Sequence, residues 1–263
     1  MTDELRTHDG LTLRYRSWSR DPDGALPPVV LLHGFAAHAR LNWEGPGVVE
    51  ALVARGRRVY APDARGHGDS DGPHTDACYG ESLMARDVRL LIDRIGADRV
   101  HVAGYSMGAV VAILAAAQDA RISRLVVGGI GAGAVEVGGL DTRVIPPDLV
   151  SAALTAEDAA DAPARTRAFR VLADTAGGDR LALAAQIRSV HRDALPLDRI
   201  VVPTLVLAGA DDPLATRPEV LASAIAGAEL AVLPGDHLTA VRDPGFAVSI
   251  AGFLSRDRAH PHT

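Results

Sequence analysis

The sequence predicts a single α/β domain built on a doubly wound, mostly parallel β-sheet. Short apolar runs rich in β-branched residues are bounded by Gly or Pro, which is typical of strands buried on both faces. Stretches with helical spacing of apolar residues separate these runs, and the alternation favours right-handed strand–helix–strand crossovers. The chain has 263 residues, of which 48% are hydrophobic, and this is enough for one domain with a full core.

The strands are expected where these runs occur. Residues 11–18 alternate polar and apolar side chains, which indicates a half-exposed strand near an edge of the sheet. No strand is predicted before this segment, because the first ten residues are mainly polar. The remaining predicted strands are continuous apolar runs at 29–32, 57–61, 100–103, 125–127, 204–207 and 230–233.

Helical patterns separate the strands, and Gly or Pro marks several of their ends. Gly56 and Gly96 each follow a helical pattern and suit a left-handed C-terminal cap. Residues 106–117 are almost all apolar, so this helix is expected to be buried. The other predicted helices span 50–55, 82–95, 218–226 and 244–254.

Residues 131–198 break this alternation, because no convincing strand occurs among them. We therefore expect a core formed by 1–130 and 199–263 and a helical insertion formed by 131–198. The insertion would lie above the carboxyl ends of the strands, where open α/β sheets bind ligands. A lid over a ligand site is the preferred interpretation, and plain cover of the sheet is the alternative. Its helices are expected at 147–154, 163–174 and 180–193.

The composition excludes several kinds of chemistry. All 27 basic residues are arginine, so a Schiff-base lysine, a Walker-type lysine and a Ser–Lys dyad are excluded. Cys78 is the single cysteine, which excludes an intrachain disulfide and a thiolate metal cluster. The histidines have no spacing typical of a metal site, and no cofactor or metal is implied.

The charge and hydropathy of the chain favour a small-molecule substrate as its partner. The net charge of −6 gives no electrostatic reason to expect binding to nucleic acid or to an anionic membrane. No apolar stretch reaches the roughly 18 residues of a membrane span, and the polar N-terminal segment does not resemble a secretory signal. A cytoplasmic location is therefore expected, whereas the oligomeric state is not indicated.

The pentapeptide Gly104-Tyr105-Ser106-Met107-Gly108 is the strongest functional signal in the chain. It follows a predicted buried strand and opens a predicted buried helix. A nucleophile on such a sharp turn needs small residues two positions before and two positions after it. The amide groups at the helix N-terminus then favour developing negative charge. Ser106 is therefore the candidate nucleophile, with an ordinary serine at the start of a buried helix as the alternative.

A serine nucleophile needs a general base and an acid that orients this base. Asp211 and Asp212 follow the predicted strand 204–207, and His237 follows the predicted strand 230–233. The carboxyl ends of parallel strands share one edge of the sheet, so these residues are expected beside Ser106. His237 is the candidate base, and Asp212 or Asp211 is the candidate orienting carboxylate.

In these motifs the chain resembles the α/β-hydrolase fold family, and the resemblance covers nearly its whole length. The resemblance implies that the acid stands third after the glycine that closes its strand, which selects Asp212. It also implies an oxyanion hole formed by the backbone N–H groups of Phe35, after His33-Gly34, and Met107. The segments that carry the resemblance are 31–35, 62–70, the serine pentapeptide, 203–209 and His237.

The sequence departs from the family pattern beside the histidine. Asp236 precedes His237 where glycine is frequent, and this places a second carboxylate next to the candidate base. Asp63 is expected to brace the turn that follows it, and His67 is given the same structural role. His38 and Arg40 are expected at the surface, with contact to the substrate as the alternative. A second departure, Ala109 for a frequent glycine, affects packing alone.

The expected activity is hydrolysis of a carboxylic ester, lactone or thioester through an acyl-enzyme. Serine at position 106 argues against dehalogenase and epoxide hydrolase activity, since those members of the family generally have aspartate as the nucleophile at this turn. A C–C bond hydrolase or a lyase-like member with the same triad is an alternative, and so is a non-catalytic member that binds a ligand under its lid. The insertion has one aromatic residue, Phe169, which indicates an aliphatic or compact pocket.

Overall fold

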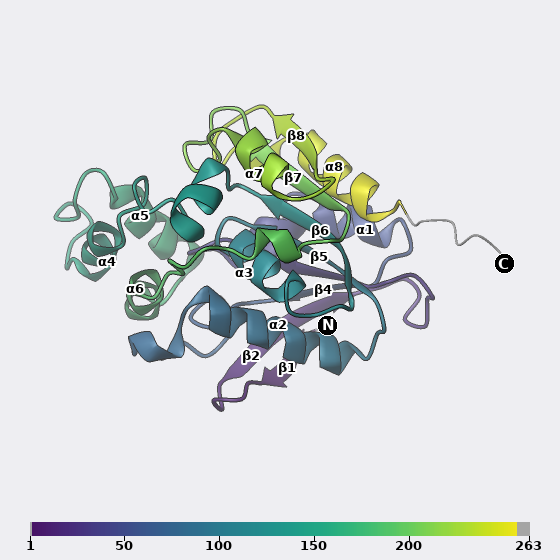
Figure 1. Ribbon diagram of the computed structural model, residues 1–263. Coiled ribbons are helices and arrows are strands. Elements are labelled where there is room, and N and C mark those ends of the chain that lie inside the picture. The colour runs from purple at the N-terminus through teal and green to yellow at the C-terminus, as the bar shows by residue number, and fades with distance from the viewer. Residues whose placement is uncertain (1, 257–263) are drawn as a thin grey trace.

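The computed structural model describes residues 2–256, in which eight strands form one sheet with helices on both faces (Figure 1). The last residues of the predicted core, 257–263, lie outside the described residues. The strands are β1 (Thr2–Arg6), β2 (Thr12–Trp18), β3 (Val29–Leu32), β4 (Val59–Pro62), β5 (Val100–Tyr105), β6 (Ile122–Gly128), β7 (Thr204–Gly209) and β8 (Glu229–Leu233).

The sheet has the order β1-β2-β4-β3-β5-β6-β7-β8. From β4 to β8 all neighbouring strands are parallel, whereas β1 and β2 pair antiparallel at one edge. The predicted mostly parallel sheet is therefore confirmed. Its parallel strands all end at the same edge, and this common edge is where the candidate residues are placed.

The described helices form two layers around the sheet. Helices α1 (Val48–Val53) and α8 (Pro244–Leu254) cover one face, and α2 (Glu81–Ile95), α3 (Met107–Ala116) and α7 (Pro218–Ala224) cover the other. Successive residues of a buried strand pack against the two helical layers alternately, because their side chains point to opposite faces of the sheet. In β3, Val29 and Leu31 pack toward α1 and α8, and Val30 and Leu32 pack toward α2 and α3. The predicted buried helix after Ser106 is present as α3.

Strand β1 was not predicted from the sequence. It is an edge strand in which Leu5 is the single buried residue, so it carries no clear hydrophobic period. Because β1 occupies the edge of the sheet, the strand predicted near an edge, which is β2, is the second strand from that edge. The register of this pair runs from Thr2 opposite Arg16 to Arg6 opposite Thr12.

Residues 129–203, which we call the β6–β7 segment, contain three α-helices between β6 and β7. Helices α4 (Pro147–Thr155), α5 (Arg167–Ala176) and α6 (Arg180–Arg188) pack on one another at the left of Figure 1. Helix α5 begins later than predicted, and α6 ends earlier. At the end of α6, the Ser189 hydroxyl donates to the carbonyls of Asp76 and Ala185, and the chain then leaves the helix.

Polar contacts attach the β6–β7 segment to the core. The Arg188 guanidinium lies 2.6 Å from an Asp76 carboxylate oxygen, and His74 Nε2 lies 2.8 Å from Asp179 Oδ2. A buried contact lies at the start of α2, where Glu81 Oε2 accepts a hydrogen bond from the His191 amide at 2.7 Å. Whether the segment acts as a lid stays a prediction.

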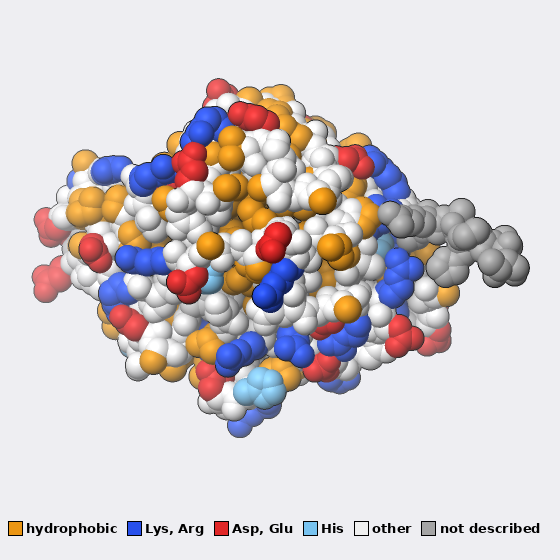
Figure 2. Space-filling model, in the orientation of Figure 1, with side chains coloured by type: hydrophobic (Ala, Val, Ile, Leu, Met, Phe, Trp, Pro, Cys, Tyr) orange, Lys and Arg blue, Asp and Glu red, His pale blue; other side chains and the backbone are white. Residues whose placement is uncertain are grey.

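The face in view in Figure 2 carries interspersed acidic and basic side chains. Such mixed charge offers no continuous basic surface on that face for a nucleic acid backbone. Within residues 2–256, no helix combines the length and the apolar character that a membrane crossing requires.

Candidate active site

Ser106 stands on the sharp turn between β5 and α3. Its backbone has φ 55° and ψ −118°, an unusual conformation for a residue with a side chain. The chain can turn this sharply because its neighbours lack side chains. A Cβ on Gly104 would lie 2.0 Å from the Gly108 carbonyl oxygen, and a Cβ on Gly108 would lie 2.1 Å from that of Leu32. The predicted need for small residues at both positions therefore has a steric cause.

The structure brings Ser106, His237 and Asp212 together in one hydrogen-bonded array. His237 Nε2 lies 3.0 Å from Ser106 Oγ, and His237 Nδ1 lies 2.7 Å from Asp212 Oδ2. A carboxylate can only accept a hydrogen bond, so Nδ1 carries the proton and the Nε2 lone pair faces the serine hydroxyl. Ser106 and Asp212 are buried, with 4% and 3% of their surface exposed, and His237 is half-buried.

The array distinguishes the two aspartates that follow β7. Asp212 points inward, and its second oxygen, Oδ1, accepts a hydrogen bond from the Leu214 amide at 2.8 Å. Asp211 is exposed, and its amide donates to the Gly235 carbonyl at 3.0 Å. Asp212 therefore occupies the position that the family resemblance implied, and Asp211 lies in the turn.

The loop after β3 lies against the serine. A Cβ on Gly34 would lie 3.3 Å from Ser106 Cβ, and the Gly34 amide donates to Asn42 Oδ1 at 2.9 Å. Phe35 follows and lines the same cavity as Ser106. Met107 is the first residue of α3, and the first amides of a helix have no acceptor within the helix. The two amides predicted as oxyanion donors thus belong to the loop after β3 and to the first turn of α3.

Two residues that contribute to this arrangement were not recognised in the sequence. The buried Asn42 holds the Gly34 amide from a short π-helical turn, Arg40–Glu44. Tyr105 donates its hydroxyl hydrogen to the His237 carbonyl oxygen at 2.8 Å. Neither contact has a sequence signal, because an asparagine in a loop and a tyrosine before a serine do not by themselves indicate which group they will bind. The contacts become visible only in the folded chain.

The neighbouring acids serve local structure. Asp63 Oδ2 accepts from the Asp69 amide at 3.1 Å, so Asp63 braces the turn that follows it, as predicted. Its Oδ1 also accepts from the Ala39 amide at 2.8 Å, a contact with the loop after β3 that was not predicted. Asp236 Oδ1 accepts from the amide and the hydroxyl of Thr239, and these hydrogen bonds hold the pKa of Asp236 below its ordinary value. Asp236 therefore caps the turn that carries His237.

Two histidines near the serine loop have different surroundings. Burial, together with the neighbouring His33, lowers the pKa of His67 to about 3, so its ring is neutral. His67 Nδ1 lies 3.0 Å from the Arg65 carbonyl oxygen, which agrees with the structural role predicted for it. Arg40 is exposed, whereas the half-buried His38 lines the cavity beside Ser106, which is the alternative given for it and not the preferred surface position. Its position follows from the turn that begins at Arg40.

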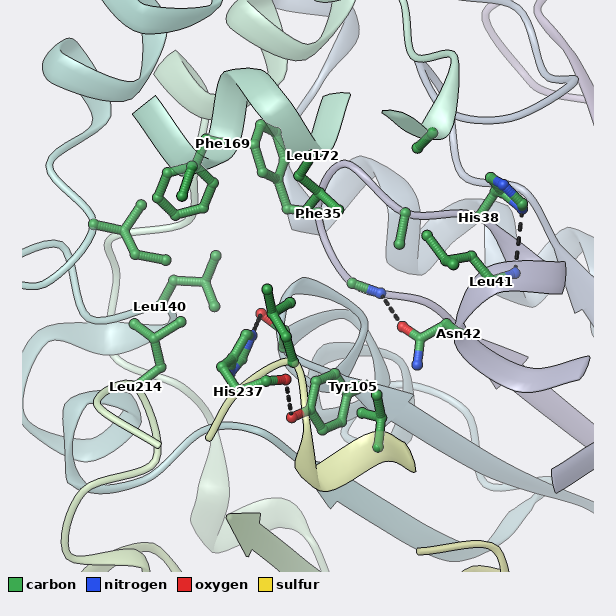
Figure 3. A pocket seen from close by; sticks show the side chains of 18 of the residues that line it. Phe35, His38, Leu41, Asn42, Tyr105, Leu140, Phe169, Leu172, Leu214 and His237 are labelled. Carbon is green, nitrogen blue, oxygen red and sulfur yellow. Dashed lines mark hydrogen bonds between the residues drawn. The ribbon is translucent and has the colours of Figure 1, made fainter. Parts of the chain in front are cut away.

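A cavity of about 850 Å³ opens above Ser106. Its walls come from the loop after β3, the turn after β8 and the β6–β7 segment, and they are mainly apolar. In Figure 3, Leu140, Phe169 and Leu214 lie on one side of His237, and His38, Leu41 and Asn42 lie on the other. Among the described lining residues there is no Asp or Glu, and the charged ones are Arg165 and Arg242.

The described part of the chain contains no group of three or more His, Cys, Asp or Glu side chains arranged to hold a metal ion. Cys78 is half-buried and packs against the core, away from the lining of the cavity. Ser106 and His237 both line the cavity.

Comparison with known proteins supports the fold. A family model described as alpha/beta hydrolase fold matches residues 27–130. The chain is 40% identical over 111 residues to the sn-1-specific diacylglycerol lipase ABHD11 of Mus musculus, a match that covers 41% of this chain and 34% of that protein. The chain thus spans about a third of the length of the curated relatives it matches.

Solved structures match over nearly the full length. A hydrolase from Pseudomonas aeruginosa PA01 is 30% identical, with a TM-score of 0.77, and the match covers 96% of this chain and 98% of that one. The enol-lactonase from Burkholderia xenovorans LB400 is 26% identical, with a TM-score of 0.75, and the match covers 97% and 100% of the two chains. Since sheet order, serine turn and full-length similarity agree, the chain belongs to the α/β-hydrolase fold family.

Proposed function

We propose that this protein is a serine hydrolase that cleaves a carboxylic ester, lactone or thioester through an acyl-enzyme intermediate. The observation that carries the proposal is the array in which His237 lies 3.0 Å from Ser106 Oγ and 2.7 Å from Asp212 Oδ2, at the floor of a mainly apolar cavity. An ordinary helix-capping serine would need neither the strained turn nor the buried acid behind the imidazole.

In the first half of the reaction, Ser106 Oγ attacks the substrate carbonyl while His237 Nε2 takes the hydroxyl proton. Asp212 keeps the imidazole in the tautomer that accepts this proton and stabilises the imidazolium that forms. The negative charge moves to the carbonyl oxygen, where the amides of Phe35 and Met107 would donate to it. The tetrahedral intermediate collapses when His237 gives the proton to the leaving alcohol or thiol.

The second half repeats these steps with water. His237 takes a proton from a water molecule, and the resulting hydroxide attacks the acyl carbon bound to Ser106. The same two amides would hold the second oxyanion. The proton returns to Ser106 Oγ as the acid product leaves, so the enzyme is regenerated without a cofactor.

The cavity supports an aliphatic substrate of small to medium size. Its walls are mainly hydrocarbon, and Phe169 is the one aromatic side chain that the β6–β7 segment contributes to them. The charged lining residues are Arg165 and Arg242, so neutral and anionic esters are expected to bind better than cationic ones. The helices over the cavity would exclude water as a lid does.

The test combines a serine-directed probe with a substrate panel. The parent should react with a fluorophosphonate and hydrolyse p-nitrophenyl esters, and Ser106→Ala should lose labelling and at least roughly 10⁴-fold in kcat. Ser123→Ala is the matched control, because this half-buried serine donates to the Val100 carbonyl and lies outside the cavity lining. Labelling of Ser106→Ala at the parent's rate would contradict the proposal.

Lactones, thioesters and vinylogous diketones extend the panel to the bonds that the same array could break. Turnover of the diketones with no turnover of esters would favour C–C bond hydrolysis. Tight binding of an unreacted ligand, with no labelling of the parent, would favour a ligand-binding protein.

A further inference from the structure

Tyr105 links the two reacting residues of the proposed site. It precedes Ser106 in the chain, and its hydroxyl donates to the main-chain carbonyl of His237 at 2.8 Å (Figure 3). Its ring also packs against the imidazole, with the two ring centroids 5.1 Å apart and their planes at 36°. One side chain therefore contacts both the backbone and the ring of His237.

The turn that carries His237 has little other burial to hold it. Pro234, Asp236, Leu238 and Thr239 are all exposed, and the hydrogen bonds of Asp236 stay within this turn. The hydrogen bond from Tyr105 instead ties the turn to β5, the central strand that ends at the serine. Asp212 fixes one ring nitrogen, whereas Tyr105 fixes the position of the backbone from which the ring extends.

Tyr105 itself is held rigidly. It is 4% exposed, and Phe246 packs edge-on against its ring, with the two ring centroids 5.7 Å apart. On the other side, a Cβ at Gly129 would lie 2.7 Å from Tyr105 Cζ and 3.0 Å from His237 Cε1, so glycine is required where the two rings meet. Burial also raises the pKa of Tyr105 above its ordinary value, which keeps its hydroxyl a donor.

These contacts form a closed ring of bonds. The ring runs from Ser106 through the peptide bond to Tyr105, across the hydrogen bond to the His237 carbonyl, along the imidazole, and back through Nε2 to Ser106 Oγ. Without Tyr105, the turn that carries His237 would be tied to the core through the end of β7, by contacts such as the hydrogen bond from the Asp211 amide to the Gly235 carbonyl, and not to the strand that ends at Ser106. A short ring fixes the separation of Oγ and Nε2 far more closely than distant packing does.

We propose that Tyr105 is a positioning residue, which holds His237 at hydrogen-bonding distance from Ser106 through its contact with the His237 main-chain carbonyl. The inference rests on the proposed function, because it concerns the geometry of the same serine and histidine. It assigns Tyr105 no contact with the reacting atoms.

The test is Tyr105→Phe, compared with Tyr79→Phe. Tyr79 is a matched control, because it is 5% exposed and its hydroxyl donates to the Pro73 carbonyl at 2.6 Å, away from the array. Each variant loses one buried hydroxyl and keeps its ring. We expect Tyr105→Phe to lower kcat for p-nitrophenyl butyrate roughly tenfold, the effect of one hydrogen bond, with KM within about twofold of the parent. Tyr79→Phe should keep both constants within about twofold.

A second measurement follows the histidine directly. The proton between His237 Nδ1 and Asp212 gives a far-downfield proton resonance, which should broaden and exchange faster with water in Tyr105→Phe. The loss of kcat should likewise occur in Tyr105→Phe alone. A merely structural contribution of the hydroxyl would lower thermal stability in both variants without changing either signal.

The outcomes separate the two proposals. If the parent labels with fluorophosphonate but Tyr105→Phe keeps kcat within twofold, or if Tyr79→Phe loses as much, the positioning role is wrong. If the parent is inert to every serine probe and substrate, the proposed function fails. In that case the downfield resonance still tests the positioning role of Tyr105. An unchanged resonance in Tyr105→Phe would show that the Tyr105 hydroxyl does not position His237.

Discussion

The serine turn and the β6–β7 segment border the same cavity but are held by different kinds of contact. At the turn, backbone atoms meet so closely that a Cβ on Gly104 would lie 2.0 Å from the Gly108 carbonyl oxygen. In the β6–β7 segment, the half-buried Phe169 contacts the core through the ring of Phe35, and the two ring centroids lie 6.2 Å apart. The first contact admits no substitution without movement of the backbone, whereas the second is one apolar contact among several.

This difference suggests a division of tasks. The core holds the groups of the proposed chemistry in a backbone-determined geometry, and the β6–β7 segment supplies a wall whose side chains can vary. Substitutions at the core should therefore reduce turnover of every substrate. Substitutions in the wall should change which substrate is preferred. The following predictions test that division, from the largest expected effect to the smallest.

Asp212→Asn should have the largest effect. An amide can donate to His237 Nδ1 and favour the wrong tautomer, so kcat should fall by about 10³- to 10⁴-fold with little change in KM. Asp211→Asn is the matched control, since Asp211 is exposed and lies in the turn. Steady-state kinetics on one p-nitrophenyl ester measure both. Equal losses in the two variants would contradict the assignment of Asp212.

Gly104→Ala tests the steric requirement of the turn. The added Cβ meets the Gly108 carbonyl, so the free energy of unfolding should fall by about 3 kcal/mol or more and activity should fall with it. Gly252→Ala in α8 is the control, because a Cβ there meets no atom within 4 Å and should be neutral or stabilising. Urea unfolding distinguishes them. A stable, active Gly104→Ala protein would refute the steric account.

Glu81→Gln tests the junction between the core and the β6–β7 segment. Glu81 is 1% exposed, and burial raises its pKa from 4.5 to about 7. A raised pKa means that the unfolded chain releases this proton at lower pH than the folded protein. The protonated Glu81 carboxyl therefore makes its full contribution to the free energy of unfolding below about pH 4.5. This contribution is lost as the pH rises through about 7.

The free energy of unfolding of the parent should accordingly fall between pH 5 and pH 8 more steeply than that of Glu81→Gln, which does not titrate. Glutamine retains an oxygen that can accept from the His191 amide, the contact that Glu81 Oε2 makes at 2.7 Å. Glu50→Gln, at an exposed position of α1, should follow the parent. Parallel curves for the parent and Glu81→Gln would show that Glu81 titrates normally.

Phe169→Ala should have the smallest effect on the chemistry. The shorter side chain enlarges the cavity, so the ratio of kcat/KM for long over short acyl esters should rise by about tenfold or less. Turnover of the best substrate should stay close to that of the parent. Val171→Ala is the control on the same helix, since Val171 is 52% exposed and outside the cavity lining. A uniform loss for all esters would contradict the division of tasks.

The parallel sheet, the buried helix after Ser106 and the approximate positions of most helices could be predicted from the sequence. Each depends on a local pattern: apolar runs of strand length, or Gly and Pro at element ends. Edge strand β1 could not, because a single buried residue, Leu5, leaves no period to recognise. The sequence also left His38 open between the surface and the substrate site, since the turn beside it has no sequence signature.

The serine turn and the chain order of Ser106, Asp212 and His237 could also be predicted, because the steric rule for the turn operates within five residues. The residues by themselves left Asp211 and Asp212 open as the orienting acid, and the family resemblance selected Asp212. Only the tertiary structure decided two other contacts between separate segments, Asn42 on the Gly34 amide and Tyr105 on the His237 carbonyl. Such contacts depend on how distant segments pack, and a change of a few tenths of an ångström in that packing makes or breaks a hydrogen bond.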